Sequence, residues 1–198
     1  MTFVELQGVK AKQLTSQNFA PGYDPHGAPP AGVTINGTEQ NDLIVGGLGA
    51  DKLYGRGGAD QIIGGAGNDL IDGGADDDDL QGGAGNDTIY GGAGNDTLVD
   101  ALGSNKFFGG EGNDFIQSFG SFGTPMASAV MDGGAGNDFL WAQNQVSATV
   151  KGGGGDDNVI VYFNGSTNVH LGGGNDFVRV YGTGVQAYWQ PLGLYRER

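Results

Sequence analysis

The sequence predicts an all-β fold in which short strands stack as a solenoid, and three observations lead to it. A nine-residue unit, Gly-Gly-x-Gly-x-Asp-x-aliphatic-x, repeats almost without interruption from Gly46 to Val99. Glycines open each unit, and one apolar residue stands at its eighth position. A unit this short cannot bury its apolar side chain alone, so successive units must stack on one another.

Each unit divides into a turn and a strand. Glycine permits the positive φ angles that a tight six-residue reversal requires. The last three residues place one apolar side chain between two variable ones, which is the pattern of a short strand with one inward position. The inward side chains are expected to be Ile44, Leu53, Ile62, Ile71, Leu80, Ile89, Leu98, Phe107, Ile116, Leu140, Val159 and Val178.

The aspartate at the sixth position recurs at one point of every turn. Neighbouring coils of such a stack lie about 4.8 Å apart, so their carboxylates would repel one another. A hard divalent cation, bound by carboxylate and main-chain carbonyl oxygens, would turn this repulsion into a cross-link. The sequence therefore predicts cation sites at the turns.

The units GGAGNDLID, GGAGNDTIY and GGAGNDTLV, which begin at Gly64, Gly82 and Gly91, resemble the calcium-binding repeats of the RTX (repeats-in-toxin) family. The resemblance implies a right-handed parallel β-roll with two units per coil and Ca²⁺ between turns on the same edge. It also implies that the sixth-position aspartates and turn carbonyls bind the ions. The carbonyls expected to contribute are those of Gly65, Gly67, Gly74, Asp76, Gly82, Ala84, Gly91 and Ala93.

If two units form a coil, the aspartates of one edge recur every eighteen residues. The long edge has this spacing and later intervals of 24, 19 and 19 residues, with Asp42, Asp60, Asp78, Asp96, Asp114, Asp138, Asp157 and Asp176. The short edge has Asp51, Asp69 and Asp87, followed by Asn105, a neutral amide expected to bind more weakly. The count predicts about seven Ca²⁺ ions on the long edge and about two on the short edge, about nine in all.

The roll is expected to have two calcium edges in its N-terminal half and one in its C-terminal half. In each later coil, the other half is expected to be an ordinary strand and loop. Inward residues there are expected to be Met131, Val150 and Val169, with Ala129 and Ala148 two positions earlier, where Thr167 fits less well. The expected segments are an N-terminal cap or strand-exchange segment (1–20), a Pro/Gly linker (21–35), a regular roll (36–117), a one-edged roll with inserted loops (118–180) and a C-terminal cap (181–198).

Composition predicts a fold that depends on calcium. The net charge is −14, the chain has 42 glycines, and it has no cysteine to form a disulfide. Self-repulsion and glycine entropy oppose compaction, so the metal-free chain is expected to be largely disordered and Ca²⁺ binding to drive folding. The negative charge disfavours nucleic acid as a partner, and no apolar stretch reaches the length of a membrane span.

The expected location is outside the cell or at its surface, in a bacterium. The first residues, MTFVELQGVKAKQL, lack the apolar core of a cleaved signal peptide. The family resemblance implies export that uses an uncleaved C-terminal signal, although the C-terminal residues VQAYWQPLGLYRER are basic and aromatic and look unlike one.

Apolar side chains at outward strand positions indicate a possible interface. These residues become more frequent toward the C-terminus and include Phe115, Phe139, Trp141, Ile160 and Phe177. Outward sheet positions are rarely so apolar without a cover. Two explanations stay open: burial under the termini of the same chain, and contact between molecules, with self-association as the expected form.

The favoured function is a structural, self-assembling extracellular subunit of a layer, filament or matrix. The alternative is a non-catalytic module that helps a secreted enzyme fold or bind its polymer. An enzyme is not expected, because the sequence shows no Cys or Ser constellation near His26 or His170 and no Lys-Ser/Thr after the glycine runs, as a phosphate loop would need. Ice binding would need threonine where the third positions are Ala66, Ala75, Ala84, Ala93 and Ala135.

Overall fold

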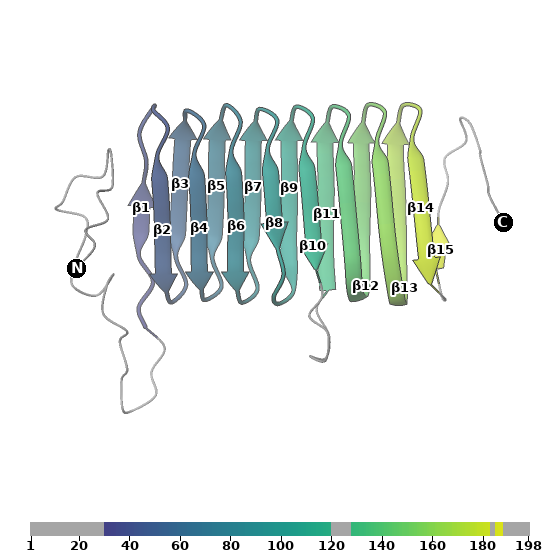
Figure 1. The fold of residues 1–198 in the computed structure, drawn as a ribbon, viewed down its shortest axis with the longest axis horizontal. Coiled ribbons are helices and arrows are strands. Elements are labelled where there is room, and N and C mark those ends of the chain that lie inside the picture. The colour runs from purple at the N-terminus through teal and green to yellow at the C-terminus, as the bar shows by residue number, and fades with distance from the viewer. Residues whose placement is uncertain (1–29, 120–127, 183–184, 188–198) are drawn as a thin grey trace.

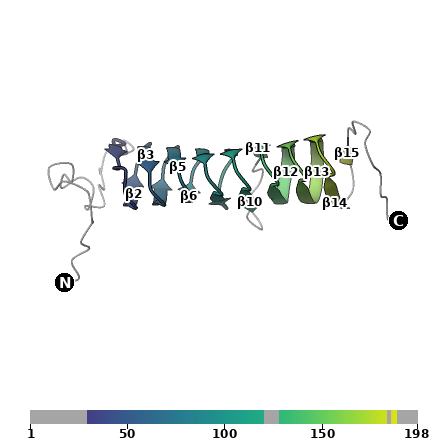
Figure 2. The same cartoon turned by 90° about the horizontal axis from the view of Figure 1, so that it is seen from above.

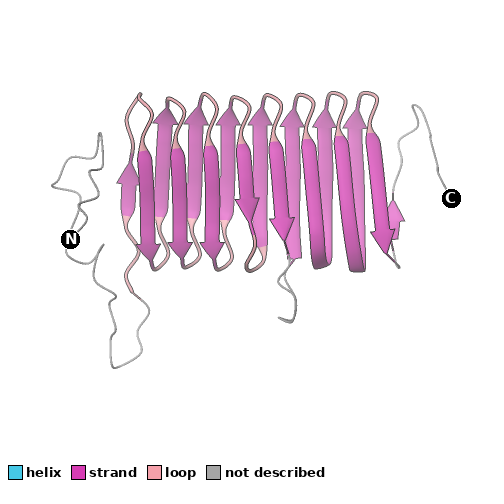
Figure 3. Ribbon diagram, viewed as in Figure 1, coloured by secondary structure: helices cyan, strands magenta, loops and turns pink. Residues whose placement is uncertain are grey.

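The computed structural model describes residues 30–119, 128–182 and 185–187, and all of its named elements are β-strands (Figures 1 and 3). None of the described residues forms a helix that could cross a membrane. The strands are β1 (Thr34–Asn36), β2 (Leu43–Leu48), β3 (Lys52–Gly57), β4 (Gln61–Ala66), β5 (Leu70–Ala75), β6 (Asp79–Ala84), β7 (Thr88–Ala93), β8 (Thr97–Asp100), β9 (Asn105–Glu111), β10 (Phe115–Phe119), β11 (Ser128–Ala135), β12 (Phe139–Gly154), β13 (Asn158–Gly173), β14 (Phe177–Gly182) and β15 (Val185–Ala187).

The strands form two parallel sheets that face each other as two layers (Figure 2). From β1 to β9, each strand pairs in parallel with the strand two places further along the chain. One layer begins with β1, β3 and β5, and the other with β2, β4 and β6. Ile44 pairs with Ile62, and Ile62 with Leu80, so the register advances by eighteen residues, as expected for two units per coil.

The C-terminal coils are built differently from the earlier ones. β12 and β13 have 16 residues each and pair with one another through both layers. Each keeps a turn at the upper edge of Figure 1 but bends around the lower edge as a continuous strand. The bend absorbs one extra residue per coil, with register shifts between Gln143 and Ser147. The short edge therefore has no glycine turn in these coils.

At each end of the roll, a short strand lies partly or wholly in a segment expected to flank it. β1 begins at Thr34, inside the segment expected to be a linker, and it pairs with β3 as part of the first coil. β15 lies in the expected C-terminal cap and pairs with β13. The expected strand-exchange segment 1–20 lies outside the described residues, as does most of the final segment.

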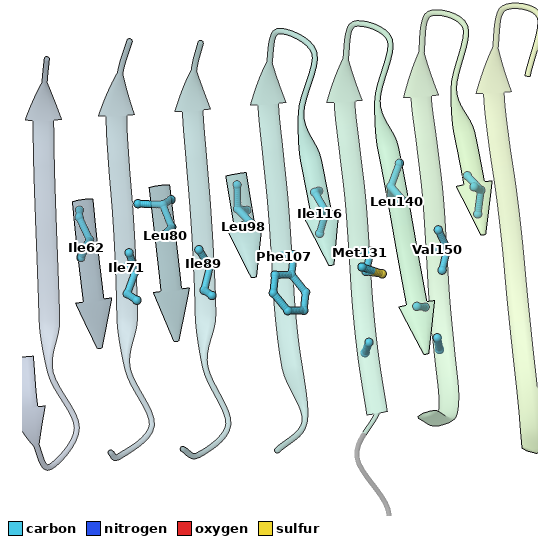
Figure 4. Close-up of a cluster of buried hydrophobic side chains, with 14 of the residues drawn as sticks. Ile62, Ile71, Leu80, Ile89, Leu98, Phe107, Ile116, Met131, Leu140 and Val150 are labelled. Atoms are coloured by element: carbon cyan, nitrogen blue, oxygen red, sulfur yellow. The ribbon is translucent and has the colours of Figure 1, made fainter. Parts of the chain in front are cut away.

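Two facing columns of apolar side chains, one from each layer, fill the space between the layers (Figure 4). The eighth-position residues from Ile44 to Val159 are at most 1% exposed, and Val178 packs against them while partly buried. In the later coils Met131, Val150 and Val169 provide the opposite wall, as predicted. Full burial of one such side chain contributes about 1.5–3 kcal/mol. The core is one side chain wide per layer, so the turns must also be held together.

Candidate metal centres

The turns reverse the chain through glycines in the left-handed region. Gly65 and Gly67, at the second and fourth positions of one unit, have φ angles of 110° and 140°. Among the described residues, two that are not glycine also adopt positive φ at these positions: Arg56 with 84° and Asp76 with 74°. L-residues pay a steric penalty there, which explains the strong preference of the repeat for glycine.

From Asp51 onward, each sixth-position aspartate accepts a hydrogen bond from the coil before it. Oδ1 of Asp60 accepts a hydrogen bond from the main-chain N–H of Asp42 at 2.7 Å, and Oδ1 of Asp78 accepts one from Asp60 at 2.8 Å. The short edge has the same bond between Asp51 and Asp69, at 2.8 Å. The structure thus brings the predicted aspartates together as two ladders. They are buried at Asp42, Asp51, Asp60, Asp69, Asp78, Asp87, Asp96, Asp114, Asp138 and Asp157, and Asp176 is half-buried.

In nine of these residues the second carboxylate oxygen has no hydrogen-bond partner within the protein, whereas Oδ2 of Asp42 accepts hydrogen bonds from the N–H and hydroxyl of Thr38. Oδ2 is buried without a hydrogen bond at Asp51, Asp60, Asp69, Asp78, Asp87, Asp96, Asp114, Asp138 and Asp157. A buried oxygen with negative charge and no donor is costly unless a cation binds it. These orphaned oxygens therefore fit a divalent cation in the turns.

Main-chain carbonyls lie beside the orphaned oxygens. A Cβ on Gly73 would collide with both Oδ2 of Asp78 and the carbonyl oxygen of Gly91. On the short edge, a Cβ on Gly64 would collide with Oδ2 of Asp69 and the carbonyl oxygen of Gly82. This crowding requires glycine at the first position even though its φ is not positive. A carboxylate oxygen and a carbonyl oxygen thus converge at each regular turn, a donor set that Ca²⁺ prefers.

Side chains alone do not complete these centres. Within the described ranges, no group of three or more His, Cys, Asp or Glu side chains is placed to share one ion. Ca²⁺ takes six to eight oxygen ligands, so carbonyls must supply most of them. Of the expected carbonyls, that of Ala84 accepts a hydrogen bond from the N–H of Gly67 at 2.8 Å, which leaves one lone pair for a cation.

Burial disfavours the charged form of the ladder aspartates. It raises the pKa of Asp69, Asp96 and Asp157 to about 6, and that of Asp78 and Asp114 to about 7. Hydrogen bonds from the preceding coil oppose this shift, and the like charges of neighbouring carboxylates add to it. A positive ion in the turns would remove the cause of the shift.

A second ladder, which the sequence analysis missed, runs along the fifth positions. The N–H of Asn113 donates to Oδ1 of Asn95 at 2.9 Å, and that of Asn137 donates to Oδ1 of Asn113 at 2.7 Å. These bonds point back to the earlier coil, opposite to the aspartate ladder. The available signal was the frequent Asn or Asp at the fifth position: Asn41, Asn68, Asp77, Asn86, Asn95, Asn113, Asn137, Asp156 and Asn175.

The short edge ends at Asn105, where the ladder continues without a carboxylate. Oδ1 of Asn105 accepts the N–H of Asp87 at 2.8 Å, as an aspartate would. Its Nδ2 donates to the carbonyl oxygen of Leu102 at 3.3 Å. The amide therefore keeps the contact between coils but presents a donor where other turns have the orphaned oxygen.

A parallel solenoid with a buried, half-satisfied carboxylate at successive glycine turns defines a metal-dependent repeat protein. The chain matches the family model of the RTX calcium-binding nonapeptide repeat (4 copies) at residues 36–71, 54–89, 72–99, 99–119 and 130–145, just over half of its length. It belongs to this family, which implies Ca²⁺ binding by its Gly/Asp turns. No curated protein and no solved structure matches the chain.

Proposed function

We propose that this chain is a secreted protein that folds when about nine Ca²⁺ ions bind and then assembles with copies of itself as an extracellular structural subunit. The calcium-binding turns follow from the family and from the orphaned oxygens. Assembly rests on one observation, a row of aromatic side chains on the outer face of one layer. Secretion from a bacterium is the location typical of RTX repeats, and it matches a chain that needs extracellular calcium.

The aromatic row, here called the aromatic strip, follows the outward positions from β10 to β14. The Phe115 and Phe139 rings stack with centroids 5.5 Å apart, and the Tyr162 and Tyr181 rings stack at 4.5 Å. Trp141 lies between the two stacks, with its ring centroid 6.5 Å from that of Tyr162. The strip consists of Phe115, Phe119, Phe139, Trp141, Tyr162, Phe177 and Tyr181.

The strip remains open to solvent toward its C-terminal end. Phe177 is 45% exposed and Tyr181 is 43% exposed. Continuous exposed apolar rows of this kind mark interaction surfaces in soluble proteins. A second copy of the chain offers the same regularly spaced rings on a parallel sheet, so two strips can pack face to face around a twofold axis. This supports contact between molecules over burial by the chain's own termini.

Calcium would also remove the electrostatic barrier to assembly. The chain carries a net charge of −14. Nine divalent ions would more than offset this charge, and repulsion between copies falls as the net charge approaches zero. Assembly is therefore expected to require calcium twice, for folding and for charge neutralisation. The proposed role is non-catalytic, because the recurring carboxylates are expected to bind Ca²⁺ at the turns.

The test compares two aromatic surfaces of equal exposure. The variant Phe177→Ser/Tyr181→Ser removes the open end of the strip. The control Tyr90→Ser removes a ring that is 40% exposed on the other layer. We expect the unmodified chain and the control to form ordered assemblies in millimolar Ca²⁺, visible by negative-stain imaging and lost on chelation. The double variant should sediment as a folded monomer.

Dispersed monomers of the unmodified chain in millimolar Ca²⁺ would contradict the assembly proposal. That result would favour the alternative role, a non-catalytic module of an exported enzyme system. Loss of assembly in the Tyr90→Ser control as well would show that the contact is not specific to the aromatic strip.

A further inference from the structure

One turn of the short edge differs from the others because its unit begins with Asp100 where the repeat has glycine. The Asp100 side chain is 2% exposed. Its Oδ1 accepts hydrogen bonds from the N–H of Ala101 at 2.6 Å and from the N–H of Gly83, on the preceding coil, at 3.2 Å. Its Oδ2 is buried and has no hydrogen-bond partner. The carboxylate is therefore held in a fixed orientation with one oxygen unused.

That unused oxygen occupies the place of a main-chain carbonyl oxygen in the regular turns. A Cβ on Gly64 would collide with Oδ2 of Asp69 and the carbonyl oxygen of Gly82. One coil later, a Cβ on Gly82 would collide with Oδ2 of Asp87 and Oδ2 of Asp100. The regular pair of one carboxylate and one carbonyl oxygen has thus become a pair of carboxylate oxygens.

The sixth position of the same unit is Asn105 instead of aspartate. Its Nδ2 donates to the carbonyl oxygen of Leu102, so this atom does not replace the orphaned oxygen of the other turns. In the regular turns, each orphaned oxygen lies beside the first position of the following coil, as Oδ2 of Asp69 lies beside the carbonyl oxygen of Gly82. The regular carboxylate between these two turns is therefore that of Asp87, and Asp100 adds a second negative charge.

Two buried carboxylates this close need either a cation or a shared proton between them. Asp87 is 1% exposed, and its Oδ2 also lacks a hydrogen-bond partner. In the described part of the chain, the only ion pair joins Lys151 to Asp132, so no basic side chain neutralises either residue. A hard cation with oxygen ligands is the group that this arrangement fits.

We propose that Asp87 and Asp100 bind an additional Ca²⁺ ion at the end of the short edge, beyond the two ions expected between the turns of Asp51, Asp69 and Asp87. The site rests on the calcium binding of the regular turns but does not depend on assembly. It extends the short edge by one ion, between the turn that ends in Asp87 and the turn that begins with Asp100.

The experiment counts bound ions per chain by native mass spectrometry in excess Ca²⁺. Asp100→Asn should hold one ion fewer than the unmodified chain. Asp87→Asn keeps an acceptor for the N–H of Asp69 and should also hold one ion fewer. The double variant Asp87→Asn/Asp100→Asn should hold no fewer ions than either single variant, because both carboxylates bind the same ion. Asp72→Asn is the matched control, since it removes a half-buried carboxylate outside the turns and should leave the count unchanged.

An unchanged ion count in Asp100→Asn would overturn the proposal and indicate that the two carboxylates share a proton. A double variant that holds two ions fewer would also overturn it, because the two carboxylates would then bind separate ions. An unchanged count in Asp87→Asn would overturn it equally, so the test stands even where Asp100→Asn does not fold. An unmodified chain with no bound Ca²⁺ would instead contradict calcium binding by the turns in general.

Discussion

The main-chain N–H of Asp96 donates to Oδ1 of Asp114, one coil later, across 2.9 Å. Between the same two turns, the N–H of Asn113 donates in the opposite direction to Oδ1 of Asn95, also at 2.9 Å. The protein itself therefore uses Oδ1 of Asp114, and Oδ2 alone remains for a cation. Hydrogen bonding and metal binding by one carboxylate can thus be separated by mutation.

The separation is tested at Asp114. Asp114→Asn keeps the acceptor for Asp96, as Asn105 does for Asp87. It removes the charged oxygen, so we expect at least one Ca²⁺ site to weaken about tenfold or more while the roll still folds in excess Ca²⁺. Asp114→Ala loses both functions and should cost a further 1–3 kcal/mol or so of stability, because a buried N–H is left unpaired. Calcium titration and urea denaturation measure the two effects.

Equal Ca²⁺ affinity and equal stability of the two Asp114 variants would contradict the assignment of Oδ1 to hydrogen bonding and of Oδ2 to Ca²⁺ binding.

Adjacent glycines of one turn should respond very differently to alanine. Gly153 has a φ of 119°, and a Cβ there would collide with the carbonyl oxygen of Gly134. Gly153→Ala should destabilise the roll by about 2 kcal/mol or more. Gly154 has no atom within 4 Å of its Cβ position, and other units have alanine at this place, so Gly154→Ala should be close to neutral. Thermal unfolding in saturating Ca²⁺ measures the stability of both variants. A similar loss of stability in Gly153→Ala and Gly154→Ala would refute the turn geometry.

Arg56 should be improved by substitution with glycine. It stands at the second position of its unit with a φ of 84°. The other units have glycine there, except for Thr38 in the opening unit and Ala101 in the degenerate unit. A left-handed conformation costs a residue with a Cβ about 1–2 kcal/mol, which the extra chain entropy of glycine partly offsets. We expect Arg56→Gly to stabilise the folded chain by about 0.5–1 kcal/mol. A lower denaturation midpoint in the variant would show that the Arg56 side chain contributes more than its strain costs.

Much of this arrangement could be predicted from the sequence because its period is strict. Leu80 and Asp78 are buried as expected, with 0% and 3% exposure. The repeat fixes their positions within the unit and therefore which residues of the neighbouring coils they pair with. Thr167 fits the inward pattern less well because its side chain is polar. It is nevertheless 2% exposed, because pairing with Ala148 in β12 sets its direction. Register therefore outweighs side-chain polarity in these coils.

The Asp100 site and the fifth-position ladder could not be predicted, because they depend on which residues of neighbouring coils stack on one another. Asp100 belongs to a degenerate unit, DALGSNKFF, and only its place above Gly82 shows that its carboxylate meets Asp87. The fifth-position ladder is similarly difficult to predict, because that position also holds Ala50 and Ala59. Its hydrogen bonds join a main-chain group to a side chain of another coil, and no local pattern in the sequence reports such a bond.

Acidification should favour the fold of the metal-free chain. Burial raises the pKa of Asp78 and Asp114 to about 7 from an ordinary value of 3.8. The folded chain then holds more protons than the unfolded chain between these pH values, so metal-free stability falls as the pH rises through about 7. Circular dichroism of dialysed, metal-free protein should show β-structure increasing from about pH 8 to about pH 5. A constant or decreasing signal over this range would contradict the burial of uncompensated carboxylates.

The central claim is that calcium completes the turns and thereby folds the roll. Far-UV circular dichroism during a Ca²⁺ titration at neutral pH tests it most directly. The account predicts a spectrum without β-structure in chelator and a cooperative change to a β-spectrum as Ca²⁺ reaches about 10⁻⁴ to 10⁻³ M. A complete β-spectrum in chelator at neutral pH would contradict it, because the apolar columns and the hydrogen-bond ladders would then hold the coils without metal.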